Sequence, residues 1–456
     1  YPDGLIVDPG APAQASRTHD LHFAQFATGG GLFSEMLLMN LDPEEEADVE
    51  VEFHGSDGEA LSFPLGGDVV VGQTYLSIPP LGMRVLQMDG SGALAGGSSH
   101  VRSTKELAGV LIFGGSFGLA GVGNSASLDN GFLAPMESNA AAEINTGIAV
   151  ANLESEETTL HLRLLGPSGT ELATSTEPLD PNGQKAVFLN ELGWSPQVDL
   201  SDFQGLIEVT SSGRTAATVL QTRPRQYATM PVVSRSLIGS TGDLNFAQFA
   251  TGGGLFSEMT LLNLDQQNDA QLDIAFRNFE GDPLSFQLDN SLVQGSLQVS
   301  VPASGMRILR TTGSGSAVGS ARVSSNRSIA GVLVFGGAFG LAGVGSGEEL
   351  QEFAAPMEKI ASAGIDTGIA VMNLENRAVS LNVRLRNLEG QQLAPADETL
   401  AARGQRAVFV GEFSWSPALD LRNFQGVLEV TADGNVAVTV LQLRPGQYAT
   451  MPVVAR

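Results

Sequence analysis

The chain has 456 residues, of which 50 are acidic and 24 are basic, so its formal net charge is −26. This charge repels nucleic acid and anionic membranes, and we expect neither as a partner. The sequence contains no cysteine, which excludes disulfide bonds, thiolate catalysis and cysteine-ligated metal sites.

Residues 1–20 form a segment that no other part of the chain repeats. Its Leu5, Ile6 and Val7 favour a short strand, and the prolines that follow disfavour a helix. Because an extended peptide can add a strand to an exposed sheet edge, we expect these side chains to dock on a neighbouring copy of the protein. A frayed terminus is the alternative. The first residue is Tyr1, and we interpret the sequence as a mature chain whose signal peptide has been removed.

Internal repetition defines the organisation of the rest of the chain. Residues 23–36 recur letter for letter at 246–259, and the two halves run in parallel from there to the end. Two further markers each occur four times, the first of them at intervals of 112, 111 and 110 residues, which indicates four modules in the order A–B–A–B. The first marker is an apolar strand ending in Asn-Leu-acid, at Asn40, Asn152, Asn263 and Asn373. The second marker is Gly-x-basic, at Gly82, Gly183, Gly305 and Gly404.

The repeats also place the module boundaries. We expect the extended segment at 1–20, module A1 at 21–137, module B1 at 138–236, module A2 at 237–357 and module B2 at 358–456. A period of this length is the size of a domain, so we expect the modules to follow one another like beads on a string rather than to stack as a solenoid.

Local patterns inside the modules are those of β-strands. Residues 48–53, 159–164 and 381–385 alternate polar and apolar side chains, and turn residues separate such runs. Asp433-Gly434 predicts a type I′ hairpin, and Ser212-Gly213 is its counterpart in B1. Short strands between frequent turns predict an all-β chain in which each module is a β-sandwich.

Two segments with three consecutive glycines lie inside the identical residues of the two halves, although the middle strands of the halves differ widely. Because glycine permits close approach of backbones, we expect these segments to contact a neighbouring module or subunit. The expected interface residues are Gly29, Gly30, Gly31 and Phe33 in A1 and Gly252, Gly253, Gly254 and Phe256 in A2.

Residues 114–118 match the Gly-x-Ser-x-Gly pattern of a serine hydrolase. That chemistry needs a helix after Ser116, but glycine-rich residues follow, and the second A module has Ala338 at this position. His161 is the only histidine downstream, and Asn382 is its counterpart in the second half. A serine hydrolase is therefore a less favoured function than the structural or carbohydrate-binding protein considered below.

Residues 329–347 contain no charged side chain, so a transmembrane helix must be considered. Glycines interrupt the run throughout, which favours a buried strand followed by a glycine-rich loop. We expect no membrane span.

The acidic cluster of Asp42, Glu44, Glu45 and Glu46 could supply the oxygen ligands that calcium prefers. The matching turn of A2, residues 265–269, has lost most of this charge. A solvated turn is therefore the preferred interpretation, with no cofactor expected.

The two tryptophans, Trp194 and Trp415, occupy matched positions in the B modules. An exposed tryptophan could stack on a sugar ring, whereas a buried one would anchor its loop on the core. The anchor is the preferred interpretation.

Three strings connect the chain with other proteins: Phe-Ala-Gln-Phe-Ala-x-Gly-Gly-Gly at 23–31, and Thr-Gly-Ile-Ala-Val-x-Asn at 146–152 and 367–373. The sequence resembles the tandem Ig-like β-sandwich modules of secreted or surface-exposed bacterial proteins. The resemblance covers nearly everything after residue 20. It implies an extracellular setting with an Ig-like fold, and it brings no catalytic residues.

We therefore expect a non-enzymatic, extracellular structural protein, a self-assembling subunit of a bacterial surface filament or layer. Strand addition and module packing would link it to copies of itself. The alternative is an adhesin or carbohydrate-binding repeat protein whose partners are surface glycans.

Overall fold

The computed structural model describes residues 17–116, 118–125, 127–129, 131–235, 242–289, 291–337 and 340–456. Leu5, Ile6 and Val7 lie outside these residues. The strands pair antiparallel throughout, and the helical elements in the described ranges are the short 3-10 turns Leu189–Glu191, Ala361–Ala363 and Val410–Glu412. The prediction of an all-β sandwich fold is confirmed.

Strand pairing is confined to four consecutive stretches of chain, which we call units A1, B1, A2 and B2 after the modules that they match. Unit A1 contains β1 (His19–Thr28), β2 (Phe33–Asn40), β3 (Ala47–Gly55), β4 (Ser62–Leu65), β5 (Asp68–Val71), β6 (Gln73–Ile78), β7 (Met83–Met88), β8 (Ala95–Ser103), β9 (Leu107–Gly115) and β10 (Gly118–Gly123). Unit B1 contains β11 (Phe132–Asn139), β12 (Asn145–Asn152), β13 (Thr158–Leu165), β14 (Glu171–Leu179), β15 (Gln184–Phe188), β16 (Asp202–Ser211), β17 (Thr215–Arg223), β18 (Gln226–Met230) and β19 (Val233–Ser234).

The second half of the chain repeats this arrangement. Unit A2 contains β20 (Leu244–Thr251), β21 (Leu255–Asn263), β22 (Ala270–Arg277), β23 (Ser285–Leu288), β24 (Ser291–Gln294), β25 (Ser296–Val301), β26 (Met306–Arg310), β27 (Ala317–Ser325), β28 (Ile329–Gly337) and β29 (Gly340–Gly345). Unit B2 contains β30 (Leu350–Ile360), β31 (Asp366–Asn373), β32 (Val379–Asn387), β33 (Gln392–Leu400), β34 (Gln405–Phe409), β35 (Asn423–Arg444), β36 (Gln447–Met451) and β37 (Val454–Ala455).

Units A1 and B1 each form two sheets, A2 forms two sheets and the separate hairpin β23–β24, and in B2 the long strand β35 connects all the strands. In A1 the orders are β1-β8-β3-β6-β5-β4 and β10-β9-β2-β7, and in B1 they are β14-β13-β16-β11-β19 and β15-β12-β17-β18. Alternating sequences form strands with one face in the core, because every second side chain of a strand points to the same side. In β13, Leu160, Leu162 and Leu164 are buried, whereas His161 and Arg163 between them are exposed.

The predicted hairpin at Asp433-Gly434 is wrong. Strand β35 runs through these residues without a turn, and its two halves have different partners: the first half pairs with β30 and β32, the second with β31 and β36. In B1 the corresponding strands β16 and β17 lie in separate sheets around Ser212-Gly213. In a β-sandwich the chain must cross from one layer to the other, and Gly213 and Gly434 lie where B1 and B2 make this crossing.

The structure also moves three boundaries. Strand β11 pairs with β16 of B1, and β30 pairs with β35 of B2, so these units begin before Phe132 and Leu350 rather than at 138 and 358. At the N-terminus, β1 already begins at His19, and the backbone N–H of Thr18 donates to Ser103. His19 and Asp20 therefore belong to β1 and not to the predicted extended segment, the rest of which lies largely outside the described residues.

The uncharged run 329–347 forms the hairpin of β28 and β29, so its second part is a strand and not the expected glycine-rich loop. Strand β28 is buried along nearly its whole length. The described part of the chain has no helix with the length and apolarity that a bilayer crossing requires.

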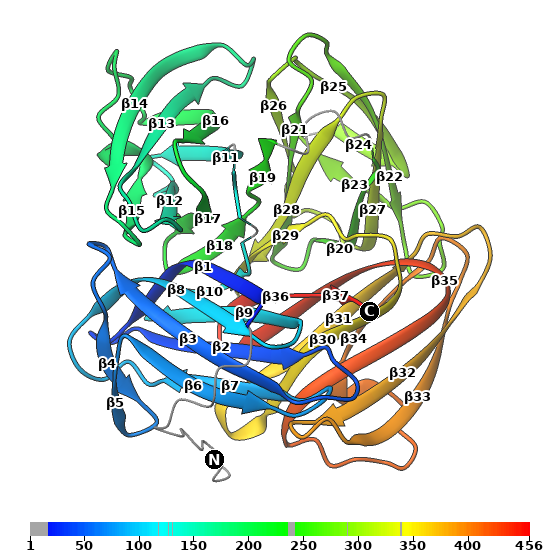
Figure 1. Cartoon of the computed structure of the whole chain (residues 1–456). Helices are drawn as coiled ribbons and strands as arrows, with labels where there is room; N and C mark the ends of the chain where they lie inside the picture. The colour runs from blue at the N-terminus through cyan, green and yellow to red at the C-terminus, as the bar shows by residue number, and fades with distance from the viewer. Residues whose placement is uncertain are drawn as a thin grey trace.

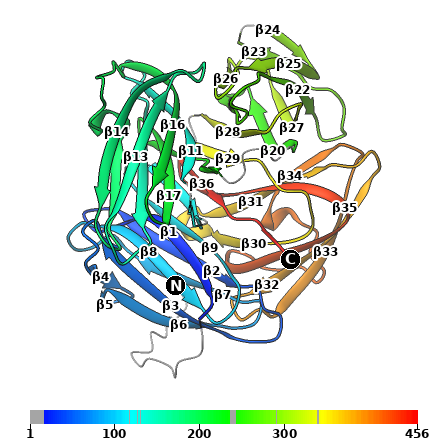
Figure 2. The ribbon, with the colours of Figure 1, turned by 45° about the horizontal axis from the view of Figure 1, so that its top comes forward.

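The units form a closed ring rather than a string of separate beads. Figure 1 shows A1 beside B1, B1 beside A2, A2 beside B2, and B2 beside A1, and the turned view in Figure 2 agrees. The ring closes because the last unit packs on the first: Leu37, Met39 and Met83 of A1 share a hydrophobic cluster with the core of B2. Strands β10, β18, β29 and β36 meet at its centre.

Candidate functional site

Each pair of neighbouring units meets at an equivalent joint. The Gly-x-basic turn of one unit contacts a loop of the unit before it, and the turn of A1 contacts B2. A Cβ atom added to Gly82 would lie 2.5 Å from the backbone oxygen of Leu388, which only glycine permits. The residue after each turn glycine donates its backbone N–H across the joint: Met83 to Leu388 (3.0 Å), Gln184 to Ser56 (3.2 Å), Met306 to Pro167 (2.9 Å) and Gln405 to Phe279 (3.3 Å).

The Asn-Leu-acid marker supports the same joints from inside each unit. The buried Asn40 donates its side-chain amide to the backbone oxygens of Glu45 (2.8 Å), Ile78 (3.1 Å) and Pro79 (3.2 Å), and so ties down the turn that carries Gly82. The corresponding asparagines bind the corresponding turns in B1, A2 and B2. Both fourfold markers are therefore parts of one structural device, the inter-unit joint.

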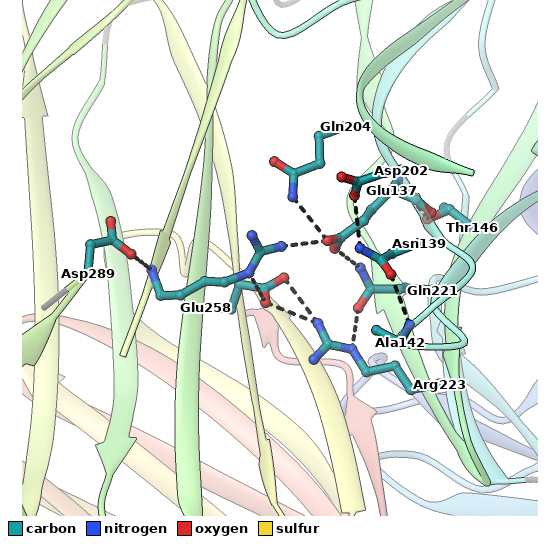
Figure 3. Close-up of polar contacts among 11 residues, drawn as sticks. Glu137, Asn139, Ala142, Thr146, Asp202, Gln204, Gln221, Arg223, Glu258 and Asp289 are labelled. Carbon is teal, nitrogen blue, oxygen red and sulfur yellow. Dashed lines mark hydrogen bonds and ion pairs between the residues drawn. The ribbon is translucent and has the colours of Figure 1, made fainter. Parts of the chain in front are cut away.

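Buried carboxylates occupy the two interfaces at which a B unit is followed by an A unit. At the B1–A2 interface, Glu137 of β11 and Glu258 of β21 are 5% and 3% exposed. Figure 3 shows two guanidinium groups beside them, one of which bridges both carboxylates. Arg310 donates to Glu137 (2.5 Å) and to Glu258 (2.8 Å), and Arg223 donates to both oxygens of Glu258 (3.1 Å each).

Amide side chains complete this network, and all four charges are compensated. Gln204 and Gln221 donate to Glu137 at 3.2 and 2.9 Å, and Gln221 accepts from Arg223 at 3.0 Å. Burial raises the pKa of Glu137, as does the nearby Glu258, whereas Arg310 opposes the rise. Two carboxylates and two guanidiniums give the cluster no net charge.

The B2–A1 interface repeats this arrangement with one cation fewer. Arg444 forms an ion pair with Glu35 of β2 and lies over the ring of Phe33, 5.0 Å from its centroid. Glu358 of β30 accepts from Gln425 (2.6 Å) and from Gln442. Opposite Glu35, where A2 has Arg310, A1 has the neutral Gln87. Two carboxylates therefore share one guanidinium.

The charge imbalance shows in the protonation of Glu358. Its side chain is 1% exposed, and burial, together with the nearby Glu35, raises its pKa to about 7. The described structure thus holds a titratable group at the interface that closes the ring.

The interfaces within each half use amide contacts instead. Gln184 of B1 donates to the backbone oxygen of Ala24 (3.1 Å) and to the side chain of Gln25 (3.0 Å), and Gln405 of B2 binds Ala247 and Gln248 in the same way. The identical residues 23–36 thus contact both neighbours of A1, through Ala24 and Gln25 on one side and Phe33 and Glu35 on the other.

Of the predicted interface residues, the two phenylalanines contact another unit. Phe33 lies against Arg444 of B2, and Phe256 lies against Arg223 of B1, 5.3 Å from the ring centroid. The glycine segments turn against their own units: a Cβ atom on Gly29 would lie 2.0 Å from the backbone oxygen of Ala93, and one on Gly252 would lie 1.4 Å from that of Gly315. Gly30, Gly31, Gly253 and Gly254 complete the same two turns, each with positive φ.

The acidic cluster near Asp42 binds its own turn. One Asp42 carboxylate oxygen accepts the backbone N–H groups of Glu44 and Glu45, both at 2.8 Å, and these bonds lower the pKa of Asp42. Lys105 forms ion pairs with Asp42 and Glu45, while Glu46 is exposed. No group of acidic or histidine side chains within the described ranges has the arrangement of a metal site.

The serine motif also has a different context from the one hydrolysis needs. Ser116 lies in the turn between the antiparallel strands β9 and β10, whereas a nucleophile elbow joins a strand to a helix. His161 is exposed on β13, in the neighbouring unit.

The tryptophans anchor their loops, as preferred from sequence. Trp194 donates its indole N–H to the backbone oxygen of Leu189 (2.8 Å), and Trp415 donates to that of Val410 (2.9 Å). Trp415 is buried, but Trp194 is only half-buried and lines a groove.

Sequence reasoning missed the buried glutamates. A signal was present, because Glu137 and Glu358 follow the same Ala-Pro-Met string inside an apolar strand, and a lone acid in such a run requires a buried partner. The partner cations lie far away in sequence, so the pattern could not identify them.

Comparisons with known proteins name no family for this chain. No protein-family model and no curated protein matches it. Among solved structures, the Anabaena sensory rhodopsin transducer is similar over 20% of this chain and 95% of its own, at 12% identity and a TM-score of 0.18. The Sulfolobus turreted icosahedral virus structure covers 87% of this chain and 90% of its own, at 12% identity and a TM-score of 0.11. Glycoside hydrolase family 32 from Bifidobacterium adolescentis covers 94% and 100%, at 8% identity and a TM-score of 0.12. Likenesses of this size identify neither a fold nor a function.

Proposed function

We propose that this chain is a non-enzymatic, extracellular structural protein, a rigid subunit that assembles with copies of itself into a surface filament or layer. The proposal rests on one observation: the residues that repeat in every unit lie at the joints between units. The asparagine and glycine markers of all four units form the joints between neighbouring units. A subunit that transmits load needs such fixed geometry, and it needs no cofactor.

The outer edges of the ring offer sites for self-association. In A1 the β4–β5 hairpin ends the six-stranded sheet, and its Val69 and Val71 are 68% and 65% exposed. In A2 the matching hairpin exposes Leu292. Apolar side chains on a terminal hairpin favour pairing with another chain, because an edge strand has unpaired backbone groups. We propose that Leu5, Ile6 and Val7 of one copy add to such an edge of the next copy.

The test compares the unmodified full-length protein with three variants by sedimentation and negative-stain electron microscopy. Deletion of residues 1–16, which leaves β1 intact, and the double variant V69K/V71K should each abolish regular polymers. The variant L94K, at an equally exposed apolar position outside the strands, is the matched control and should polymerise normally. Unchanged polymers from the deletion and the double variant, or a protein that never polymerises, would contradict the proposal.

A further inference from the structure

A groove of about 640 Å³ opens in unit B1 beside Trp194. Its volume lies within the range of about 300–1,000 Å³ that small-molecule sites occupy. The loop after β15 forms most of the lining, and the end of β11 supplies the rest. The lining residues are Ser138, Ala140, Asn190, Leu192, Gly193, Trp194, Gln197, Val198, Asp199, Leu200 and Ser201.

The groove combines a fixed aromatic ring with groups that form hydrogen bonds. The bond from Trp194 to Leu189 holds the indole in place, while the side chain remains half-buried. Asn190 accepts a bond from Asn145 (3.3 Å) through its oxygen, which leaves its amide hydrogens for a ligand. One oxygen of Asp199 accepts the backbone N–H of Ser201 (2.9 Å), and its second oxygen can accept another bond.

The charge of the groove selects among ligands. Hydrogen bonds from Ser201 lower the pKa of Asp199, so this carboxyl group is ionised at neutral pH. None of the described lining residues is basic. Phosphates and acidic sugars would be repelled, and a single carboxylate is too few ligands for a divalent cation.

Unit B2 provides the internal comparison, because larger side chains stand at three of the corresponding positions. Lys359 and Phe413 replace Ser138 and Leu192, and Arg422, which replaces Ser201, forms an exposed ion pair with Asp420, the counterpart of Asp199. The Phe413 ring lies 5.2 Å from that of Trp415, and the Lys359 amine lies 3.3 Å from where a Cβ of Gly411 would be. The same loop therefore buries its tryptophan in B2 and exposes it to a groove in B1.

We propose that the groove beside Trp194 binds a neutral saccharide, which stacks on the indole and forms hydrogen bonds with Asn190, Gln197 and Asp199. A sugar ring presents an apolar face and a rim of hydroxyl groups, and this groove offers a partner for each. The binding goes beyond the structural function and does not depend on assembly.

The test uses tryptophan fluorescence, because the chain has two tryptophans and the variant W415F leaves Trp194 as the only one. Maltotriose, cellotriose and triacetylchitotriose, all neutral, are titrated into full-length W415F, and at least one should change the emission saturably. Absence of a saturable change with all three sugars would overturn the proposal.

Two variants in the W415F background locate the binding. S138K/L192F/S201R fills the groove with the side chains of B2 and should abolish binding. D199N preserves the shape of the groove and should weaken binding about ten-fold through the loss of a charged acceptor. Thermal unfolding of each variant checks that the fold is intact, and unchanged affinity in the filled variant would show that the sugar binds elsewhere.

Discussion

The two interfaces between a B unit and the following A unit have the same architecture and different charge. At B1–A2, Glu137 and Glu258 are matched by Arg223 and Arg310, whereas at B2–A1 the pair Glu358 and Glu35 has Arg444 alone. The difference is one residue, Gln87 in place of Arg310. Units B1 and A2 are also consecutive in the chain, but B2 and A1 are held together only by contacts.

This difference predicts that B2–A1 is the less stable of the two interfaces. Removing two carboxylates from water costs free energy that ion pairs must offset, and an uncompensated buried charge is strongly destabilising. The B2–A1 interface carries that excess charge and lacks a covalent tether. We therefore expect the ring to open there first. Variants at B2–A1 and matched variants at B1–A2 test this expectation.

The largest effect should come from removing the lone cation. Arg444→Met leaves Glu35 and Glu358 without a guanidinium and should lower the free energy of unfolding by about 3–5 kcal/mol. Arg223→Met is the matched control, since Arg223 and Arg444 are similarly buried and Arg310 still bridges both carboxylates in the control. Denaturant unfolding at about pH 8, where Glu358 is mostly ionised, measures both variants. Equal losses would show that the charge imbalance has no energetic effect.

A second experiment weakens the joints at the same two interfaces. Asn40→Ala and Asn263→Ala each remove three side-chain hydrogen bonds that hold a docking turn. Each should cost about 1–3 kcal/mol, because buried backbone oxygens lose their donor. Hydrogen exchange should rise more in β2 and β30 of the Asn40 variant than in β21 and β11 of the Asn263 variant, since the chain does not tether B2 to A1. The reverse order would argue against a weakest point at B2–A1.

A third experiment restores the missing cation. Glu358 has a folded pKa of about 7 and an ordinary value of 4.5, so the folded state binds the proton more tightly. Stability from this group is therefore present below about pH 4.5 and is lost as the pH rises to about 7, at about 1.4 kcal/mol per unit of pKa difference. Gln87→Arg should lower this pKa, flatten the decline and stabilise the protein by about 1 kcal/mol at about pH 8.

The control for the third experiment is Arg310→Gln, which makes B1–A2 resemble B2–A1 and should steepen the loss of stability with rising pH. Unfolding midpoints between about pH 5 and pH 8 measure both variants. A Gln87→Arg variant with the wild-type pH dependence would exclude Glu358 as its source.

The smallest effect should come from the surface turns beside the two interfaces. Lys105→Gln and Arg327→Gln each remove a cation from a solvated turn, next to Asp42 and Asp265 respectively. Both should leave the unfolding midpoint nearly unchanged, because exposed ion pairs contribute little. Calcium or a chelator should also have no effect on the midpoint of the unmodified protein, and a calcium-dependent rise that Asp42→Asn removes would contradict the assignment of this cluster to its own turn.

Much of the fold could be predicted because its signals are local. Alternation in residues 159–164 specifies a strand with one buried face, and turn residues mark where strands end. The prediction at Asp433-Gly434 failed for a non-local reason: the dipeptide suits a tight hairpin, but the flanking strands find partners in opposite sheets. The candidate site could be predicted only in part: Phe33 and Phe256 contact neighbouring units as expected, whereas the buried Glu137 and Glu358 were missed because their cationic partners lie far away in sequence.

The repeat, the all-β character and the residues that recur in every unit can be identified from the amino-acid sequence, because they depend on periodicity within short stretches of chain. The structural roles of those residues become visible only in the folded chain. Whether Asn40 and Gly82 cooperate, whether Glu358 faces Glu35 and whether Trp194 is covered all depend on which surfaces meet after folding. These contacts form between residues that can lie hundreds of positions apart in the sequence. They depend on packing and on buried charge rather than on local propensity.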